Sequence, residues 1–517
     1  MVQSDRSEPI HQPELVRTAH SGRWRGVRYV ILNKHERMRR RMKVTCSMMM
    51  KLSGLCIALL LWLSPAKSQG LFESAQAEEQ SISGQPALSI GGFIRSVGYI
   101  GQTPAEETPY LQSAYGQVGL LLNARAATWA TAKADIRFRY GTEWQQPVSE
   151  FDIREAYVDL YAGPTGFKFG KFISPWGKGT VFNPTEKVTP MDPTVRSPIE
   201  DDMNLGVWGL QGHVNLGTYV KLTGTWQPLY QPSVLLIDPV PMPDYVMFLE
   251  PEYPGVELKE SSYGFNLDLY APAMDAALYW FEGYHHWPGI KYDSFVIDSV
   301  TMQPLALNML EKAYRIRMLG MDMSKPVGAW IFRIEGAWQQ TVESHTDHEY
   351  LPFPELSYTA EIEKSGNWLT LLAGYYGKYI LEFTAPAADP SLSAGQDQFL
   401  QLMQSGFPLT GSAIDGLMRE QVNAFNRLYN YQLEELYHTA FVVLKGSFWH
   451  DQVEVTAPFI YNITTEEWVI QPKISYMPGD GIKLTAGYSG LYGQEESLYD
   501  MVGPTLNAGF LSIKLTF

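Results

Sequence analysis

The sequence predicts an all-β fold, a transmembrane antiparallel β-barrel of about 18 strands, with about 16 as the alternative. Three observations lead to this prediction. The final strand separates apolar from polar side chains with period two, the connections between strands alternate between short and long, and charged residues recur at every second position of several strands. A barrel in lipid has an apolar outward face and a polar inward face, and side chains alternate between the two.

The last nine residues show the clearest alternation. Gly509, Leu511, Ile513, Leu515 and Phe517 fall on one face of a strand, and the residues between them make a largely polar face. Because an exposed apolar edge invites aggregation, the pattern favours a closed barrel in lipid over the edge of a soluble sandwich. The terminal aromatic resembles the C-terminal signal of bacterial outer-membrane barrels. That resemblance makes Leu515 and Phe517 the expected assembly signal, and the barrel assembly machinery an expected partner.

The N-terminal part is expected to be removed. Lys51 precedes a largely apolar run of 12 residues, 52–63, and small residues such as Ala66 and Ser68 follow. This composition is typical of a secretory signal peptide, and the run is too short to span a bilayer as a permanent helix. The expected division is an N-terminal extension and signal peptide at 1–68, a periplasmic segment at 69–87 and the barrel at 88–517.

Without residues 1–68 the composition changes. That segment holds 13 of the 40 Lys and Arg residues and 4 of the 55 Asp and Glu residues, so the remainder has a formal charge of −24. An acidic balance argues against nucleic-acid partners. Both cysteines, Cys46 and Cys56, lie in the same segment, so no disulfide or Cys-bound metal is expected beyond it. The remainder shows no linker or repeat, which favours one large barrel over several domains.

Two kinds of connection alternate along the chain. Short turns such as 163–165 and 478–480 are separated by long connections such as 174–203 and 382–434. Outer-membrane barrels have short periplasmic turns and longer extracellular loops, and an even strand count places both termini in the periplasm. The expected strands are 88–102, 111–123, 129–142, 151–162, 166–173, 204–215, 217–228, 260–271, 275–286, 312–323, 329–342, 355–364, 367–381, 435–449, 452–462, 467–477, 481–492 and 505–517.

Charges at alternate positions indicate which side chains face the lumen. Lys133, Arg137 and Arg139 share one face of a strand. A Lys or Arg facing lipid at the bilayer midplane costs roughly 2–4 kcal/mol, so these residues should face water. Lys168 and Lys171 have opposite parity, and a bulge at the glycine between them would turn both inward. The expected pore-lining residues on strands are Lys133, Arg137, Arg139, Glu155, Asp159, Lys168, Lys171, Arg315, Arg317 and Arg333.

Two segments resemble known channels. Residues 154–159 (REAYVD) and 169–184 (FGKFISPWGKGTVFNP) resemble the paired strands of phosphate-selective and related porin-type barrels, and the second also resembles a wider group of outer-membrane channel families. The resemblance implies a diffusion channel in the outer membrane. It also implies that Lys168, Lys171 and Lys178 face an anionic or polar solute.

One long connection is a candidate constriction. Connection 174–203 carries Lys178 near its start and three acidic residues, Glu200, Asp201 and Asp202, near its end. In general porins the third long loop folds inward. Opposed charges across a narrow lumen would make a transverse field that selects among solutes. The alternative is an ordinary solvated loop.

These observations predict a passive channel for small hydrophilic solutes, anionic ones among them, in the outer membrane with its lipid and lipopolysaccharide. A homotrimer is one candidate assembly. Two alternatives stay open: an adhesin or assembly protein whose barrel is plugged by connection 382–434, and a polysaccharide exporter. No enzyme and no cofactor are predicted. The pairs His285 with His286 and His345 with His348 are not expected to bind a metal.

Overall fold

A computed structural model describes most of the chain after residue 86. The expected signal peptide and nearly all of the expected periplasmic segment lie outside the described part, as does part of connection 382–434. The described residues are 87–102, 108–126, 128–236, 243–298, 303–388, 411–495 and 497–517.

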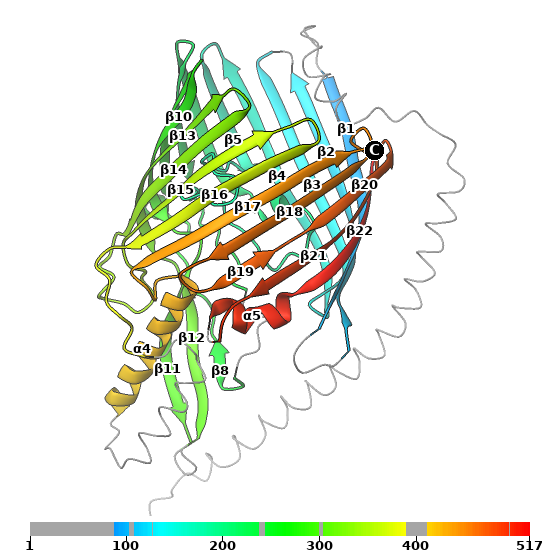
Figure 1. The fold of residues 1–517 in the computed structure, drawn as a ribbon. Coiled ribbons are helices and arrows are strands. Elements are labelled where there is room, and N and C mark those ends of the chain that lie inside the picture. Colours follow the sequence, from blue (N-terminus) through cyan, green and yellow to red (C-terminus); the bar gives the residue numbers. More distant parts are fainter. Residues whose placement is uncertain are drawn as a thin grey trace, which may run out of the picture. The chain divides into compact units, whose positions relative to one another are not determined.

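The main element is a sheet of 19 antiparallel strands that closes on itself (Figure 1). Closure occurs between the first and last strands, which pair from Phe93 with Thr516 to Gly101 with Ala508. Its strands are β1 (Ala87–Gly101), β2 (Tyr110–Ala126), β3 (Ala130–Glu143), β4 (Gln146–Ala162), β5 (Thr165–Phe172), β6 (Val207–Leu216), β7 (Val220–Gln227), β9 (Ser262–Ala271), β10 (Met274–Tyr284), β13 (Arg315–Val327), β14 (Trp330–Thr341), β15 (Glu355–Ser365), β16 (Leu369–Ile380), β17 (Leu436–Phe448), β18 (Val453–Asn462), β19 (Glu467–Ile470), β20 (Lys473–Gly479), β21 (Ile482–Tyr492) and β22 (Ala508–Thr516).

The strand count agrees with the prediction. β19 and β20 are two halves of one barrel strand, because both pair with β18 on one side and β21 on the other. Pro472 lies between them, and proline has no N–H to give to a ladder. Counted together, the two halves reduce the sheet to the predicted 18 strands.

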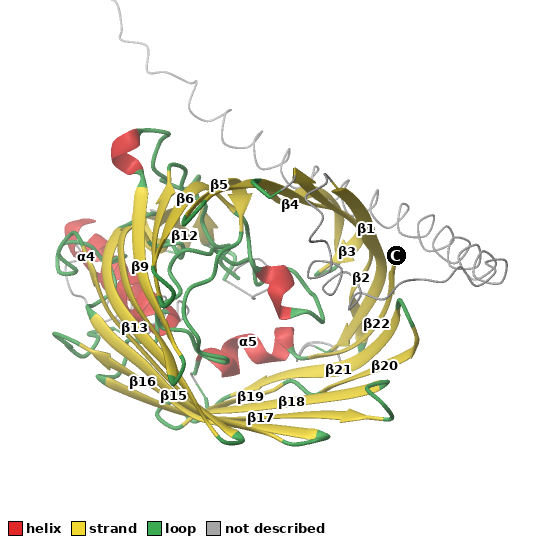
Figure 2. Cartoon of the chain, turned by 90° about the horizontal axis from the view of Figure 1, so that it is seen from above, coloured by secondary structure: helices red, strands yellow, loops and turns green. Residues whose placement is uncertain are grey.

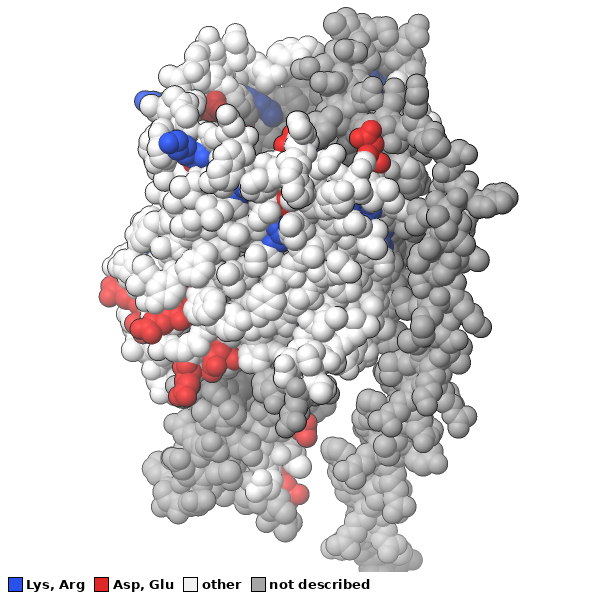
Figure 3. Space-filling view, turned by 45° about the vertical axis from the view of Figure 1, so that its right-hand side comes forward, with Lys and Arg blue, Asp and Glu red and all other residues white. Residues whose placement is uncertain are grey.

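The strand faces differ as predicted. On β22, Leu511 and Ile513 are exposed on the outside, whereas Ser512 between them is buried in the lumen. In Figure 3 the middle of the visible barrel face is white, with charged residues above and below it. An apolar outer band bounded by charge is the surface of a barrel surrounded by lipid. In the described part of the chain, no helix has both the length and the hydropathy needed to cross a membrane.

The expected difference between the two barrel ends has two exceptions. Only Trp144 and Gln145 separate β3 from β4, and only residues 463–466 separate β18 from β19, although both connections lie at the long-loop end. β4 therefore begins five residues before its predicted start at 151. Trp144 and Gln145 have φ values of 48° and 62°, and a two-residue turn with positive φ at both positions matches the twist of a hairpin.

A smaller unit lies beyond the barrel at the long-loop end (Figure 1). It contains a three-stranded sheet of β8 (Val246–Phe248), β12 (Pro304–Lys312) and β11 (Gly289–Ile297). Helix α4 (Gly411–Tyr429), which lies in connection 382–434, packs Met418 and Val422 against this sheet. The described part of that connection thus covers the small sheet.

Candidate pore constriction

The long connection between β5 and β6 folds into the barrel. We call residues 173–206 the constriction loop. Trp176 stacks on an aromatic ring of β10 with centroids 5.3 Å apart, and Lys178 pairs with a carboxylate of β13 at 3.0 Å. Phe182 reaches a ring of β16 at 4.5 Å, after which the loop returns to place Asp202 beside β1. Figure 2, a view along the barrel, shows loop segments in green within the ring of strands.

An apolar cluster fixes the start of the loop. Besides stacking on Tyr279, Trp176 meets Phe281 edge-on at 6.3 Å. A Cβ atom on Gly264 would come within 2.5 Å of the Trp176 ring, so only glycine lets the ring lie on β9. Val188 joins the same buried cluster. The lumen beside β9, β10 and β13 is therefore filled by packed side chains.

Two carboxylates on the inner wall hold the next part of the loop. Glu335 of β14 accepts hydrogen bonds from three backbone N–H groups of the loop at 2.8–2.9 Å and from the Thr185 hydroxyl at 2.8 Å. Glu361 of β15 accepts bonds from the N–H groups of Thr180 at 2.8 Å and Val181 at 3.3 Å. Both side chains are 4% exposed. Hydrogen bonds to a buried charged acceptor are among the stronger ones in proteins, so the loop is clamped here.

A third carboxylate closes the loop on itself. Glu186 accepts hydrogen bonds from the backbone N–H groups of Val188 and Thr189, both at 2.8 Å, and from that of Trp176. Burial raises the pKa of Glu186 to about 7, against the opposing effect of these N–H groups. Hydrogen bonds within the loop thus stabilise it next to the part that Glu335 and Glu361 hold on the wall.

The returning half of the loop ends in the 3₁₀ turn η1 (Glu200–Met203). Asp202 forms ion pairs with Arg95 of β1 and Arg137 of β3, both at 2.7 Å. Burial alone would raise the pKa of Asp202, but the two guanidinium groups outweigh it and hold this pKa well below its usual range. Arg154 donates to the backbone carbonyl of Asp201. The turn is therefore docked on the wall formed by β1 to β4.

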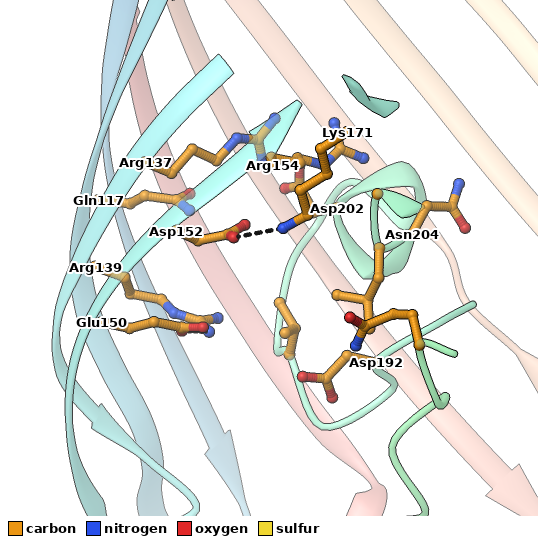
Figure 4. A pocket seen from close by; sticks show the side chains of 14 residues that line it. Gln117, Arg137, Arg139, Glu150, Asp152, Arg154, Lys171, Asp192, Asp202 and Asn204 are labelled. Carbon is orange, nitrogen blue, oxygen red and sulfur yellow. Dashed lines mark hydrogen bonds and ion pairs between the residues drawn. The ribbon is translucent and has the colours of Figure 1, made fainter. Parts of the chain in front are cut away.

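A charged cavity of about 170 Å³ lies between this turn and the wall. Figure 4 shows side chains of β3 and β4 projecting from the wall toward the loop. Lys171 and Asp152, on the neighbouring strands β5 and β4 of the wall, pair at 3.3 Å. Its charged lining residues are Arg137, Arg139, Arg154, Lys171, Glu150, Asp152, Asp192 and Asp202.

Most residues selected from the sequence face inward in the structure. Lys133 pairs with Glu155 at 2.8 Å, and Lys168 lies 4.0 Å from Asp159. The Lys168 amine is also 4.4 Å from the ring centroid of Tyr157. Arg333 likewise faces inward, 2.8 Å from Glu363 of β15.

Arg315 and Arg317 do not face the lumen, and the prediction for them is wrong. They share the face of Leu319 and Met321, which are exposed on the outside of β13, whereas Ile316 on the other face is fully buried. Both arginines lie where the strand emerges at the long-loop end. There the cost of a charge on the outer face falls to about 0–1 kcal/mol, so a charged residue at this height can face outward and need not face the lumen.

The predicted bulge is also displaced. The β4–β5 register runs without a shift from Lys171 to Thr165, although Gly170 has a φ of 130°. The shift lies one strand earlier, where Asp135 pairs with Glu155 but the next residue of β3 pairs with Ile153. Arg154 is the extra residue. It lies on the lumen side together with Glu155. The adjacent charged residues Arg154 and Glu155 are the sequence signal by which this bulge could have been found.

The predicted opposition of three lysines and three acidic residues holds only in part. Lys171 lines the same cavity as Asp202. Lys178 instead pairs with Asp322 on the far wall, and Lys168 pairs with Asp159. The basic partners of Asp202 are arginines of β1 and β3. Of these, Arg95 was not selected, because it is a single charge on a face that is otherwise apolar or aromatic.

No family model and no curated protein matches this sequence. Among solved structures, OccAB3 of Acinetobacter baumannii is 9% identical, with 83% of this chain and 99% of that chain covered and a TM-score of 0.47. OccK2 (OpdF) of Pseudomonas aeruginosa in complex with glucuronate is 10% identical, with 84% and 98% covered and a TM-score of 0.49. A BenF-like porin from Pseudomonas fluorescens Pf-5 is 8% identical, with 84% and 98% covered and a TM-score of 0.48. The closed antiparallel barrel is the fold class that the sequence predicts.

Proposed function

We propose that this chain forms a channel in the outer membrane for passive diffusion of small hydrophilic solutes, and that solutes with an anionic group pass most readily. The observation that carries this proposal is the charged cavity between the constriction loop and the wall. Barrels of this size leave an aqueous lumen, and a loop held inside one narrows it to molecular dimensions.

The arginines of the cavity support the preference for an anionic group. Among the described residues, Nε of Arg139 and Nε of Arg154 have no hydrogen-bond partner. The guanidinium groups of both residues line the cavity, where a solute would meet them. Carboxylate and phosphate oxygens are the acceptors that guanidinium groups bind best. The acidic residues of the same lining keep the cavity from holding an anion too tightly to release it.

Changing Arg139→Gln and Arg154→Gln together should shift ion selectivity toward cations several-fold. Two of the four cations of the cavity lining are lost, and charges act strongly at close range in a confined lumen. The measurement is the reversal potential under a salt gradient in a planar bilayer. Arg317→Gln is the control, because it removes a positive charge from the outward face instead of the cavity and should leave the reversal potential unchanged.

Two results would count against the proposal in different ways. Wild-type protein that is folded and inserted but gives no conductance would exclude the channel and favour the adhesin. An unchanged reversal potential in the double variant would exclude these arginines as the selective groups.

The location has its own test in cells. A cysteine at Ser365, at the end of β15 beside a short turn, should resist a membrane-impermeant maleimide on intact cells, whereas one at Gly416 on α4 should react. Residues 69–517 contain no cysteine, so each label reports one position. A Cβ at Gly416 would meet no other atom within 4 Å, so this substitution fits the helix. Labelling at position 365 with protection at 416 would reverse the topology.

A further inference from the structure

A short turn lies against the outside of the barrel wall. The 3₁₀ turn η2 (Leu258–Glu260) precedes β9. Arg315 donates to the backbone carbonyl of Ser261 at 3.2 Å, and its guanidinium lies 5.1 Å from the ring centroid of Tyr284. The Tyr284 hydroxyl in turn donates to Glu260. Because Arg315 and Tyr284 both belong to the outward face, the turn that they hold lies outside the barrel.

Charged side chains surround this turn. Arg317 pairs with Glu282 across the β10–β13 ladder at 3.0 Å, and both are partly exposed to the outside. Lys259 pairs with Glu257 at 3.0 Å, and both are well exposed. We call this group the outer-rim cluster; its members are Glu257, Lys259, Glu260, Glu282, Arg315 and Arg317.

The cluster begins where the apolar band ends. On β13 the next two outward residues after Arg317 are Leu319 and Met321, which are 54% and 51% exposed. Successive outward residues are about 7 Å apart along a strand, so the cluster stands at the height of the lipid headgroups if the band is in lipid. Val256 and Leu258 are 83% and 74% exposed beside it. Exposed apolar side chains beside the arginines and Lys259 suit a segment at a membrane interface, although Glu257, Glu260 and Glu282 balance the charge of these basic groups.

We propose that the outer-rim cluster binds the phosphate groups of lipids in the outward leaflet, with Val256 and Leu258 inserted at the boundary between headgroups and acyl chains. This proposal rests on the membrane location given under the proposed function. Arg315 and Arg317 present guanidinium groups, which match phosphate oxygens in geometry. The continuous apolar band below them identifies lipid as the occupant, because the same face of the same strands is already lipid-exposed.

Binding of bisphosphorylated lipid A to purified protein in detergent tests the cluster. The variant Lys259→Gln, Arg315→Gln, Arg317→Gln should bind it about tenfold more weakly, since a basic residue near an anionic lipid surface contributes up to about fivefold and pairing with Glu257 and Glu282 reduces the contributions of Lys259 and Arg317. Native mass spectrometry counts the bound lipids. Lys364→Gln is the control, because Lys364 is an exposed residue beside Trp330 at the opposite barrel end and its loss should leave binding unchanged. Equal lipid A binding by the triple variant and the wild type would overturn the proposal.

Two further experiments test whether the cluster binds lipid or free phosphate, and whether the turn enters the membrane. Inorganic phosphate in excess should not displace lipid A; full displacement would mean that the cluster binds free phosphate and not lipid. A fluorescent label on Val256→Cys should be quenched by nitroxide-labelled lipid in vesicles, whereas a label on Gly416→Cys should not. Absence of quenching at 256 would exclude the inserted turn. These readouts need no conductance, so a failure of the channel proposal leaves them interpretable.

Discussion

Replacing Glu335→Gln and Glu361→Gln is expected to free the first half of the constriction loop and to give a larger, noisier conductance with weaker ion selectivity. The two carboxylates accept six hydrogen bonds from the loop. Each hydrogen bond to a charged group contributes about 1.5–3 kcal/mol, and an amide presents fewer acceptor sites together with an N–H that repels the loop's donors. Losing even part of this interaction exceeds thermal energy several times over.

Glu363→Gln is the matched control for that experiment. Glu363 lies on the same inward face of β15 and carries the same charge, but it bonds to Arg333 and Ser365 of the wall. A nitroxide attached to Thr180→Cys reports the loop directly, because its spectrum sharpens when the backbone becomes mobile. The clamp would be excluded if the double variant, folded and inserted, kept the wild-type spectrum, conductance and selectivity.

Replacing Leu515→Asp and Phe517→Asp should prevent assembly of the barrel almost completely. Both residues belong to the outward face of the closing strand, and a charge there must enter lipid. Phe517 also closes the seam, since its N–H donates to the Gly92 carbonyl at 3.0 Å and its carbonyl accepts from the Gly92 N–H at 2.9 Å. The measurement is the amount of heat-modifiable protein in the outer-membrane fraction.

Thr516→Asp provides the control for the closing strand. This residue lies between the two others but on the lumen side, so its charge would face water. Assembly of the control together with loss of the double variant would establish the requirement for an apolar outward face. Normal levels of the double variant would contradict both the outward assignment and the assembly signal.

The sequence predicts the barrel well because its strongest signals are local. Alternation along β22 follows from strand geometry alone, and the strand count follows from the spacing of turns. Alternation along a strand mispredicts which side chains face inward where the strand contains a bulge or reaches its end. The bulge at Arg154 adds a residue that alternation does not count, and Arg315 lies at a strand end where the penalty that supports the argument has vanished.

The route of the constriction loop could not be predicted, because it depends on partners far away in the chain. Strand alternation places Glu335 on the same inward face as Arg333, but nothing near Glu335 or Glu361 in sequence specifies that their carboxylates accept from N–H groups more than 150 residues earlier. The short β3–β4 turn is a similar case. Trp144 adopts a positive φ while its ring NH donates to Thr194 at 2.9 Å and its ring stacks under Arg196 at 3.7 Å.

The packed aromatic cluster on one side of the lumen has a consequence for how this protein can evolve. Trp176, Tyr279 and Phe281 are confined among their neighbours, and truncating such side chains costs about 3–5 kcal/mol. The charged residues of β3 and β4 line a cavity instead of a packed core, so exchanges there cost less, provided that they keep ion pairs such as that of Arg137 with Asp202. New solute preferences can therefore arise by substitution of those cavity residues that do not dock the loop, while the packed cluster on the other side of the lumen stays unchanged and holds the start of the loop.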